Sequence, residues 1–198
     1  FGQYQNIALG DDTEPFIFGN YSSSYFYAIS LERARYKESL ALGTMALSLS
    51  GSSGGAGAGA GVTLSLTDNS NISTGNVFGN AGRVYQVVSG SEGTVYTGLD
   101  PNGYTPASGS YGLFLPDVGL ILLNGEALDG PNTNQGALPA GGINLSTGRS
   151  SNTNDANMGK LFTAISASIE AGDTFRLNSQ ETLASDFYFV RAQNADFN

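Results

Sequence analysis

The sequence contains no cysteine, no histidine and no tryptophan, and only 13% of its residues are charged. Without cysteine, disulfide frameworks, thiolate metal sites and thiol nucleophiles are excluded. Without histidine, the commonest general base and the commonest zinc ligand are missing. No run of about 18 apolar residues is present, so no membrane-spanning helix is expected. These absences argue against an enzyme and predict neither a cofactor nor a metal.

The few charges are mostly acidic, with 17 Asp and Glu residues against 8 Lys and Arg residues, and the formal net charge is −9. Proteins that bind nucleic acid use clustered Lys and Arg to neutralise phosphates. Over residues 51–157 the basic residues are Arg83 and Arg149 alone, so no basic stripe can form there. Nucleic acid is therefore not an expected partner.

The residues that are abundant favour strands and turns. Glycine occupies 28 positions, and Asn, Ser and Thr are frequent. This composition predicts a mainly β fold, a β-sandwich or sandwich-like arrangement of antiparallel sheets with long Gly/Asn-rich loops. One short helix is expected at about residues 157–171, because Leu161, Ile165 and Ile169 recur at helical spacing.

Two strands are informative for the architecture. The nearly continuous apolar run at residues 118–123 predicts a central strand buried on both faces. Residues 186–192, DFYFVRA, combine aromatic and β-branched side chains and predict a strand near the end of the chain.

The domain organisation follows from breaks in these patterns. Residues 1–20 are predicted to form an extended arm that ends in a short strand at 16–18, packed either on a neighbouring molecule or into the local sheet. Residues 21–198 are predicted to form a single β-rich domain. Residues 51–61, GSSGGAGAGAG, form a Gly/Ala-rich tip that is either flexible or a flat strand. The chain begins without Met and ends directly after a strand-like run, so we expect a fragment of a longer polypeptide.

The densest charge cluster lies between two alternating apolar runs. Residues 25–31 and 42–49 each alternate, and residues 32–38 (ERARYKE) connect them. The candidate interface residues in this connector are Arg33, Arg35, Tyr36 and Lys37. They are expected either to contact a neighbouring molecule or to lock the connector in a polar network. The alternative is a solvated charged turn.

Three acidic loop clusters offer carboxylates for a bound cation or for glycoside hydrolysis, at residues 11–14, 67–71 and 100–103. None has the spacing of a calcium-binding loop. Asp and Asn in loops more often form turns by bonding to their own backbone. We therefore expect turns rather than a catalytic or metal site.

Three stretches carry a resemblance to a known group of proteins. They are residues 26–38 (FYAISLERARYKE), 111–124 (YGLFLPDVGLILLN) and 187–198 (FYFVRAQNADFN). The chain resembles structural proteins of T4-like contractile-tailed phages of cyanobacteria and other marine bacteria. The resemblance implies a non-enzymatic virion protein of the tail or baseplate, made and assembled in the host cytoplasm. Its partners would be other virion proteins, including copies of itself.

A second class of function also fits the composition. A carbohydrate-binding or adhesin-like β-sandwich would use surface aromatic residues and Asp/Asn loops for binding, with or without a loop-bound cation. The ten Tyr and eleven Phe residues supply candidates for such a surface, but they are equally ordinary occupants of a β-sheet core.

Overall fold

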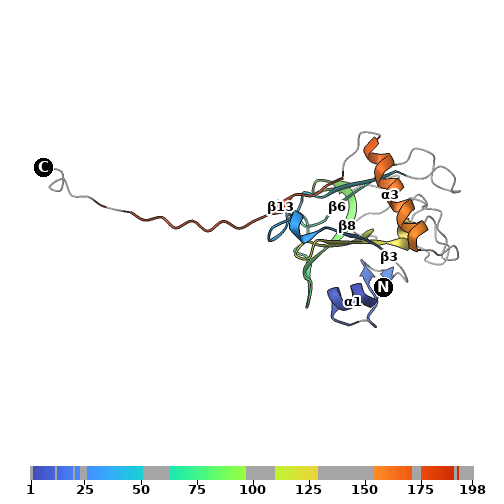
Figure 1. Ribbon diagram of the computed structural model, residues 1–198, viewed down its shortest axis with the longest axis horizontal. Coiled ribbons are helices and arrows are strands. Elements are labelled where there is room, and N and C mark those ends of the chain that lie inside the picture. Colours follow the sequence, from blue (N-terminus) through green and yellow to red (C-terminus); the bar gives the residue numbers. More distant parts are fainter. Residues whose placement is uncertain are drawn as a thin grey trace.

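The body of the protein is a curled antiparallel β-sheet with a helix across its opening (Figure 1). A computed structural model describes residues 2–11, 13–19, 21–22, 26–50, 63–96, 110–128, 154–170, 175–189 and 191. The predicted mainly β, sandwich-like fold is confirmed. The Gly/Ala-rich tip at 51–61 and the acidic loop at 100–103 lie outside the described residues.

Nine strands form the main sheet among the described residues. Seven of them follow the order β12-β5-β6-β8-β10-β11-β3, and all their pairings are antiparallel. Their bounds are β3 Phe26–Ser30, β5 Ala46–Ser50, β6 Thr63–Asp68, β8 Gly82–Ser91, β10 Gly112–Leu115, β11 Leu120–Asn124 and β12 Phe175–Arg176. The short strands β7 (Asn76–Phe78) and β9 (Thr94–Val95) pair with β8 beside this path.

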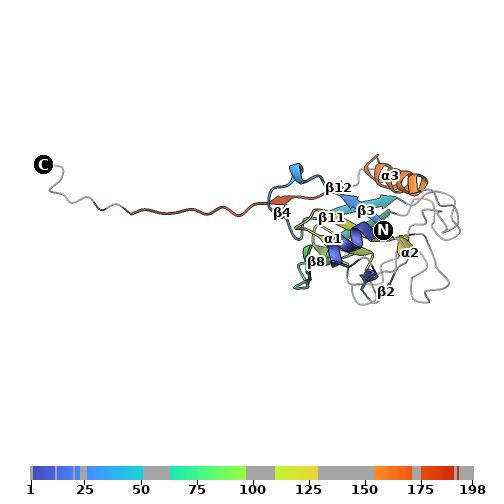
Figure 2. The ribbon, with the colours of Figure 1, turned by 60° about the horizontal axis from the view of Figure 1, so that its bottom comes forward.

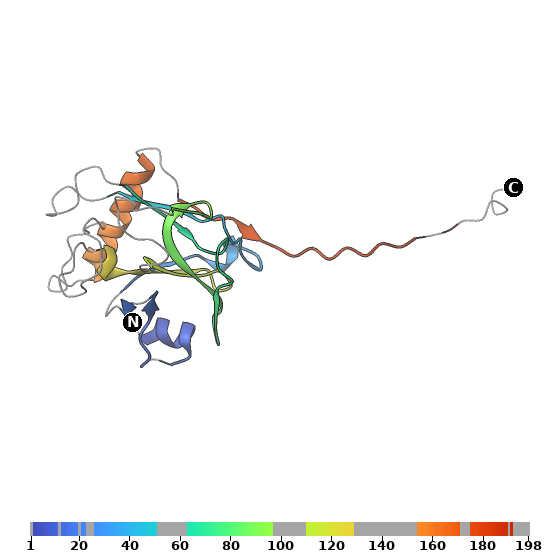
Figure 3. The same ribbon diagram turned by 180° about the vertical axis from the view of Figure 1, so that it is seen from behind.

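The long strand β8 belongs to both layers of the curl (Figure 3). It pairs with β6 through residues 87–89 and with β10 through residues 85–87. The alternating side chains of β5 and β6 meet on the inside, where Leu47 faces Leu66 and Leu49 faces Leu64. The sheet therefore wraps its apolar side chains around an inner core.

Helix α3 (Asn154–Glu170) lies across the opening between the two layers (Figures 1 and 3). Leu161 and Ala164 join the inner core, and Ile165 packs against it. The predicted helix is confirmed, with its start three residues earlier than expected. A four-residue helix, α2 (Gly125–Leu128), follows β11 and adds Leu128 to the same core.

The hairpin of β10 and β11 is buried on both faces, which confirms the central strand predicted from its apolar run. Phe114, Ile121 and Leu123 point into the inner core. Leu113, Leu115, Leu120 and Leu122 point the other way, into an outer core. A strand that is apolar at every position requires such a cover on each side.

The outer core is covered by the N-terminal unit, which we define as residues 2–22 (Figure 2). It contains helix α1 (Gly2–Leu9) and a small sheet of β1 (Ile17–Phe18) and β2 (Tyr21–Ser22). Ala8, Phe16 and Phe18 are fully buried in the outer core. The Phe16 ring meets the Phe26 ring of β3 edge-on at 5.2 Å.

The prediction of an extended arm over residues 1–20 is wrong for Gly2–Leu9, which is helical. Tertiary packing stabilises this helix, since Ala8 is buried and the Gln5 side chain donates to the Glu14 carbonyl at 2.6 Å. Gly10 ends the helix with a φ of 79°, and its N–H donates to the Asn6 carbonyl. The short strand predicted at 16–18 is present as β1, and it pairs with β2 rather than with the main sheet.

Candidate assembly interface

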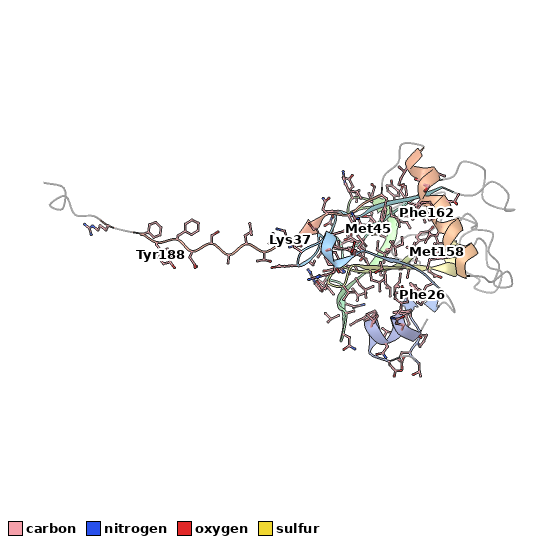
Figure 4. The ribbon with its side chains drawn as sticks, viewed as in Figure 1. Phe26, Lys37, Met45, Met158, Phe162 and Tyr188 are labelled. Atoms are coloured by element: carbon pink, nitrogen blue, oxygen red, sulfur yellow. The ribbon has the colours of Figure 1, made fainter. Side chains whose placement is uncertain are left out.

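The last described residues leave the body as an extended segment, which is the most exposed apolar part of the described chain (Figure 1). We call residues 183–189 the C-terminal segment; Figure 4 labels Tyr188 on it. Its side chains are almost fully exposed, at 80% for Leu183, 82% for Phe187, 86% for Tyr188 and 97% for Phe189. Exposed aromatic surface is unfavourable in water and is typical of an interaction site.

The predicted strand at 186–192 is thus not part of the sheet over its described residues. Residues 181–189 are extended and have no strand neighbour in the described chain. The strand-like sequence pattern remains, because alternation puts Leu183, Phe187 and Phe189 on one face and Asp186 and Tyr188 on the other. The segment has the form of a strand without a partner strand among the described residues.

The base of this segment is held by the connector that the sequence singles out. β4 (Ser39–Leu40), which directly follows the connector, pairs with β13 (Ser179–Gln180) as an antiparallel ladder, with Leu40 opposite Ser179. The Ala41 N–H donates to the Asn178 carbonyl at 2.8 Å, which extends the ladder. The pairing fixes the direction in which the chain leaves the body.

Beyond this ladder, side chains of Lys37, Glu38 and Glu181 also bind residues 181–182 to the connector. Lys37 forms an ion pair with Glu181, and Figure 4 shows Lys37 at the base of the segment. The Thr182 N–H donates to Glu38 Oε2 at 3.1 Å. We call residues 37–41 and 178–182 the exit clamp.

The connector is fastened on its other side to the turn between β10 and β11. The Leu31 N–H donates to the Gly119 carbonyl at 2.8 Å, and the Leu40 N–H donates to the Pro116 carbonyl at 3.0 Å. Tyr36 is 5% exposed and lies against Gly119. The Arg33 guanidinium lies 4.7 Å from the centre of the Tyr36 ring. The connector therefore joins the central hairpin to the exit clamp.

An ion pair stiffens this turn. Arg83 Nη2 donates to Asp117 Oδ1 at 2.6 Å, and the Arg83 backbone N–H donates to Asp117 Oδ2 at 2.8 Å. These hydrogen bonds and the positive charge of Arg83 lower the pKa of Asp117, against the opposing effect of partial burial. The carboxylate is thereby held in its ionised form, with the turn fixed to the start of β8.

The four candidate interface residues of the connector do not form one patch. Arg33 and Tyr36 contact each other, and Arg33 Nη1 also donates to the Glu38 carbonyl at 3.0 Å. Lys37 belongs to the exit clamp and forms its ion pair with Glu181. Arg35 makes an exposed ion pair with Glu32 at 3.8 Å. Arg33, Tyr36 and Lys37 thus take part in a network that holds the connector in place. A contact of any of the four residues with a neighbouring molecule stays a prediction.

Sequence reasoning missed the functional residues that pair with the connector. Glu181 and Thr182 lie 144 residues from their partners Lys37 and Glu38. No local pattern signals a contact over that distance. The aromatic run at 187–189 was visible in the sequence, but its pattern indicates a strand and does not tell whether the partner strand belongs to the same chain.

In the two acidic loops that the structure describes, the carboxylates accept hydrogen bonds from nearby backbone and hydroxyl groups. Asp11 accepts hydrogen bonds from the side chain and the backbone N–H of Thr13, which lower its pKa. Asp68 is buried, and its Oδ2 accepts from the Gly43 N–H at 2.9 Å and from the Ser70 hydroxyl. No cluster of three or more potential metal ligands occurs among the described residues. Within those residues, no helix has the length and apolar character to cross a membrane.

No protein-family model matches the chain, and comparison with curated proteins and with solved structures gives no match either. A functional interpretation therefore rests on the C-terminal segment, the exit clamp and the sequence itself.

Proposed function

We propose that the protein is a non-enzymatic structural subunit of a phage virion, in the tail or the baseplate. It acts through self-assembly and protein–protein contacts, with other virion proteins and copies of itself as partners. It is made and assembled in the host cytoplasm and ends in the virion. The resemblance of residues 26–38, 111–124 and 187–198 to phage structural proteins supports a place in a virion. The exposed C-terminal segment supports action through protein–protein contacts.

One observation carries the proposal: a clamped, extended segment presents three consecutive aromatic side chains, Phe187, Tyr188 and Phe189, to solvent. Chains that join subunits commonly do so by adding a strand to a neighbour, because main-chain hydrogen bonds give affinity and alternate side chains fill pockets. A clamp at the base reduces the conformational entropy lost when the segment docks. An enzyme or a free monomer has no evident use for such a segment.

The native assembly tests this proposal. An antibody raised against the purified chain is used to capture it from virion preparations, and the mass and subunit ratio of the captured material are measured. Electron microscopy then locates the antibody on the particles. We expect the captured material to be a defined multimer, and we expect the antibody to be seen on the tail or baseplate. A free monomer, absent from purified particles, would overturn the proposal.

The carbohydrate-binding alternative has no specific support in the described residues. The most exposed aromatic side chains lie along a projecting segment, whereas glycans are usually held on a shaped face of the body. In the described acidic loops, Asp11 accepts from Thr13 of its own turn, and Asp68 accepts from Ser70 of its own loop and from the Gly43 N–H of a neighbouring turn. A glycan-array screen, together with melting in the presence and absence of calcium, separates the two functions: hits, or a calcium-dependent rise in Tm, would favour the alternative.

A further inference from the structure

The N-terminal unit leaves a cavity of about 460 Å³ against the outer face of the sheet. Its walls are mainly apolar and include Leu9, Pro15, Phe78, Val84 and Leu113. Among the described residues, Glu14 is the single charged residue that lines it. A cavity of this size accommodates aromatic side chains, because pockets of about 300–1,000 Å³ hold ligands of several rings.

An open strand edge borders the cavity. β7 contributes Asn76 and Phe78 to its lining. Within the described chain β7 pairs with β8 alone, and Val77 at its centre is 76% exposed. An unpaired edge offers backbone N–H and C=O groups to a further strand.

The C-terminal segment matches this site in shape and charge. The two-residue period of a strand puts Phe187 and Phe189 of the segment on one face, about 7 Å apart, and the same period extends this face to Arg191, two residues beyond the segment. Two apolar side chains followed by a cation suit an apolar cavity that carries one carboxylate. The backbone of residues 183–189 pairs with no other strand of the described chain, so it is free to add to the open edge of β7.

We propose that the C-terminal segment of one copy docks on a second copy of this chain, along β7, with Phe187 and Phe189 in the cavity and Arg191 beside Glu14. This names the partner of the segment and so rests on the proposed function. The exit clamp directs the segment away from its own body (Figures 1 and 3), so the aromatic side chains are presented to another molecule. A head-to-tail contact of this kind generates a ring or an open array, unless two copies exchange segments reciprocally.

The contact is large enough to be specific. Each aromatic side chain buries about 150–250 Å². Two rings in the cavity, the flanking strand and the surface they cover on the second copy together reach about 1,000 Å², the lower bound for a biological interface.

Cysteine trapping tests the predicted neighbours, because the chain has no cysteine of its own. Full-length Glu14→Cys is mixed with full-length Arg191→Cys and oxidised mildly with diamide. We expect a disulfide-linked dimer of one copy of each. Phe162→Cys is the matched control, since Phe162 is an exposed apolar residue (70%) on α3 (Figure 4). Equal yields with Glu14→Cys and Phe162→Cys, or a higher yield with Phe162→Cys, would overturn the proposed site.

Charge exchange provides a second, independent readout. Glu14→Arg and Arg191→Glu are each expected to weaken self-association about fivefold. An equal mixture of the two variants is expected to recover it, because each variant's cavity then meets an opposite charge on the other variant's segment. Glu14 accepts the Gln5 hydrogen bond through its backbone carbonyl, so the substitution leaves that contact intact. An unchanged Tm for each variant confirms that the fold is retained.

Failure of this inference is distinguishable from failure of the proposed function. If Phe187→Ser/Phe189→Ser abolishes association while trapping and charge exchange show no effect, the segment docks elsewhere, and the inference falls while the proposed function stands. If the wild-type chain is monomeric and absent from particles, both fall.

Discussion

Tyr36 of the connector can pack against Gly119 only because glycine has no Cβ. The φ of Gly119 is 67°, and a Cβ built there lies 2.5 Å from the Tyr36 ring. We expect G119A to lower the free energy of unfolding by about 2–4 kcal/mol, from the left-handed backbone and the overlap with the ring. Urea denaturation measures it.

G79A is the matched control for this prediction. A Cβ at Gly79 meets nothing within 4 Å, and the residue is exposed. The free energy of unfolding of G79A should stay within about 0.5 kcal/mol of the wild type. Equal losses in both variants would show that Tyr36 does not pack on Gly119 as described.

Asp117 predicts a pH dependence of stability. Because Arg83 lowers the pKa of Asp117 in the folded protein, the ionised carboxylate stabilises the fold above the ordinary pKa of about 3.8. This contribution is lost as the pH falls below 3.8 towards the lowered value. We expect D117N to lose about 1 kcal/mol at pH 7, a modest figure because both side chains are about one third exposed.

The pH profile is the decisive part of that measurement. The difference in Tm between the wild type and D117N should be constant well above the ordinary pKa of 3.8 and shrink as the pH falls below it. A difference that does not change with pH would mean that the charge of Asp117 contributes nothing and that only its hydrogen bonds matter.

At the scale of elements, the connector and the exit clamp act as one device. We expect E38A to raise the hydrogen-exchange rate of the Thr182 amide several-fold, because that N–H loses its acceptor. The global free energy of unfolding should change by less than about 0.5 kcal/mol, since the contact is exposed. Hydrogen exchange followed by NMR measures both quantities.

E38Q is the control, because the glutamine side chain keeps an acceptor oxygen at the same reach. Its Thr182 amide should exchange at close to the wild-type rate. Fast exchange in E38Q, or unchanged exchange in E38A, would argue that the ladder of β4 and β13 alone holds the exit.

The elements that the sequence predicts well are those whose pattern is local. The apolar run at 118–123 identifies β11, and the helical spacing of Leu161 and Ile165, which both face the inner core, identifies α3. Ile169 continues that spacing but is 49% exposed. Helix α1 escapes prediction because its apolar residues are few, and packing on the outer core stabilises it. Only Gly10 marks its end in the sequence.

The candidate site was predictable in part for the same reason. The charge cluster at 32–38 identifies the connector, but the partners of Lys37 and Glu38 come from residues 181–182, and only the folded topology brings them together. The exposed state of Phe187 and Phe189 is likewise a property of the whole arrangement. Aromatic residues in a strand pattern are buried in most sheets. The pattern does not show whether the strand joins a sheet of its own chain or of another molecule.

At the scale of the whole molecule, the described chain divides into a closed body and an exposed extended segment. The inner core is enclosed by the curled sheet and α3, and the outer core by the N-terminal unit. The C-terminal segment takes no part in either core, so removing its aromatic side chains should leave folding intact. We expect F187S/F189S to keep the wild-type Tm within about one degree.

Sedimentation velocity of the wild type and F187S/F189S, over a wide range of concentrations, tests the central claim most directly. The wild type should form larger species as the concentration rises, and F187S/F189S should remain monomeric, with its self-association weakened roughly 100-fold or more by the loss of two buried aromatic anchors. The control I72S/I169S removes two apolar residues that are exposed on the body, at 62% and 49%, and should associate like the wild type. Identical sedimentation of the wild type and F187S/F189S would contradict the assembly role of the C-terminal segment.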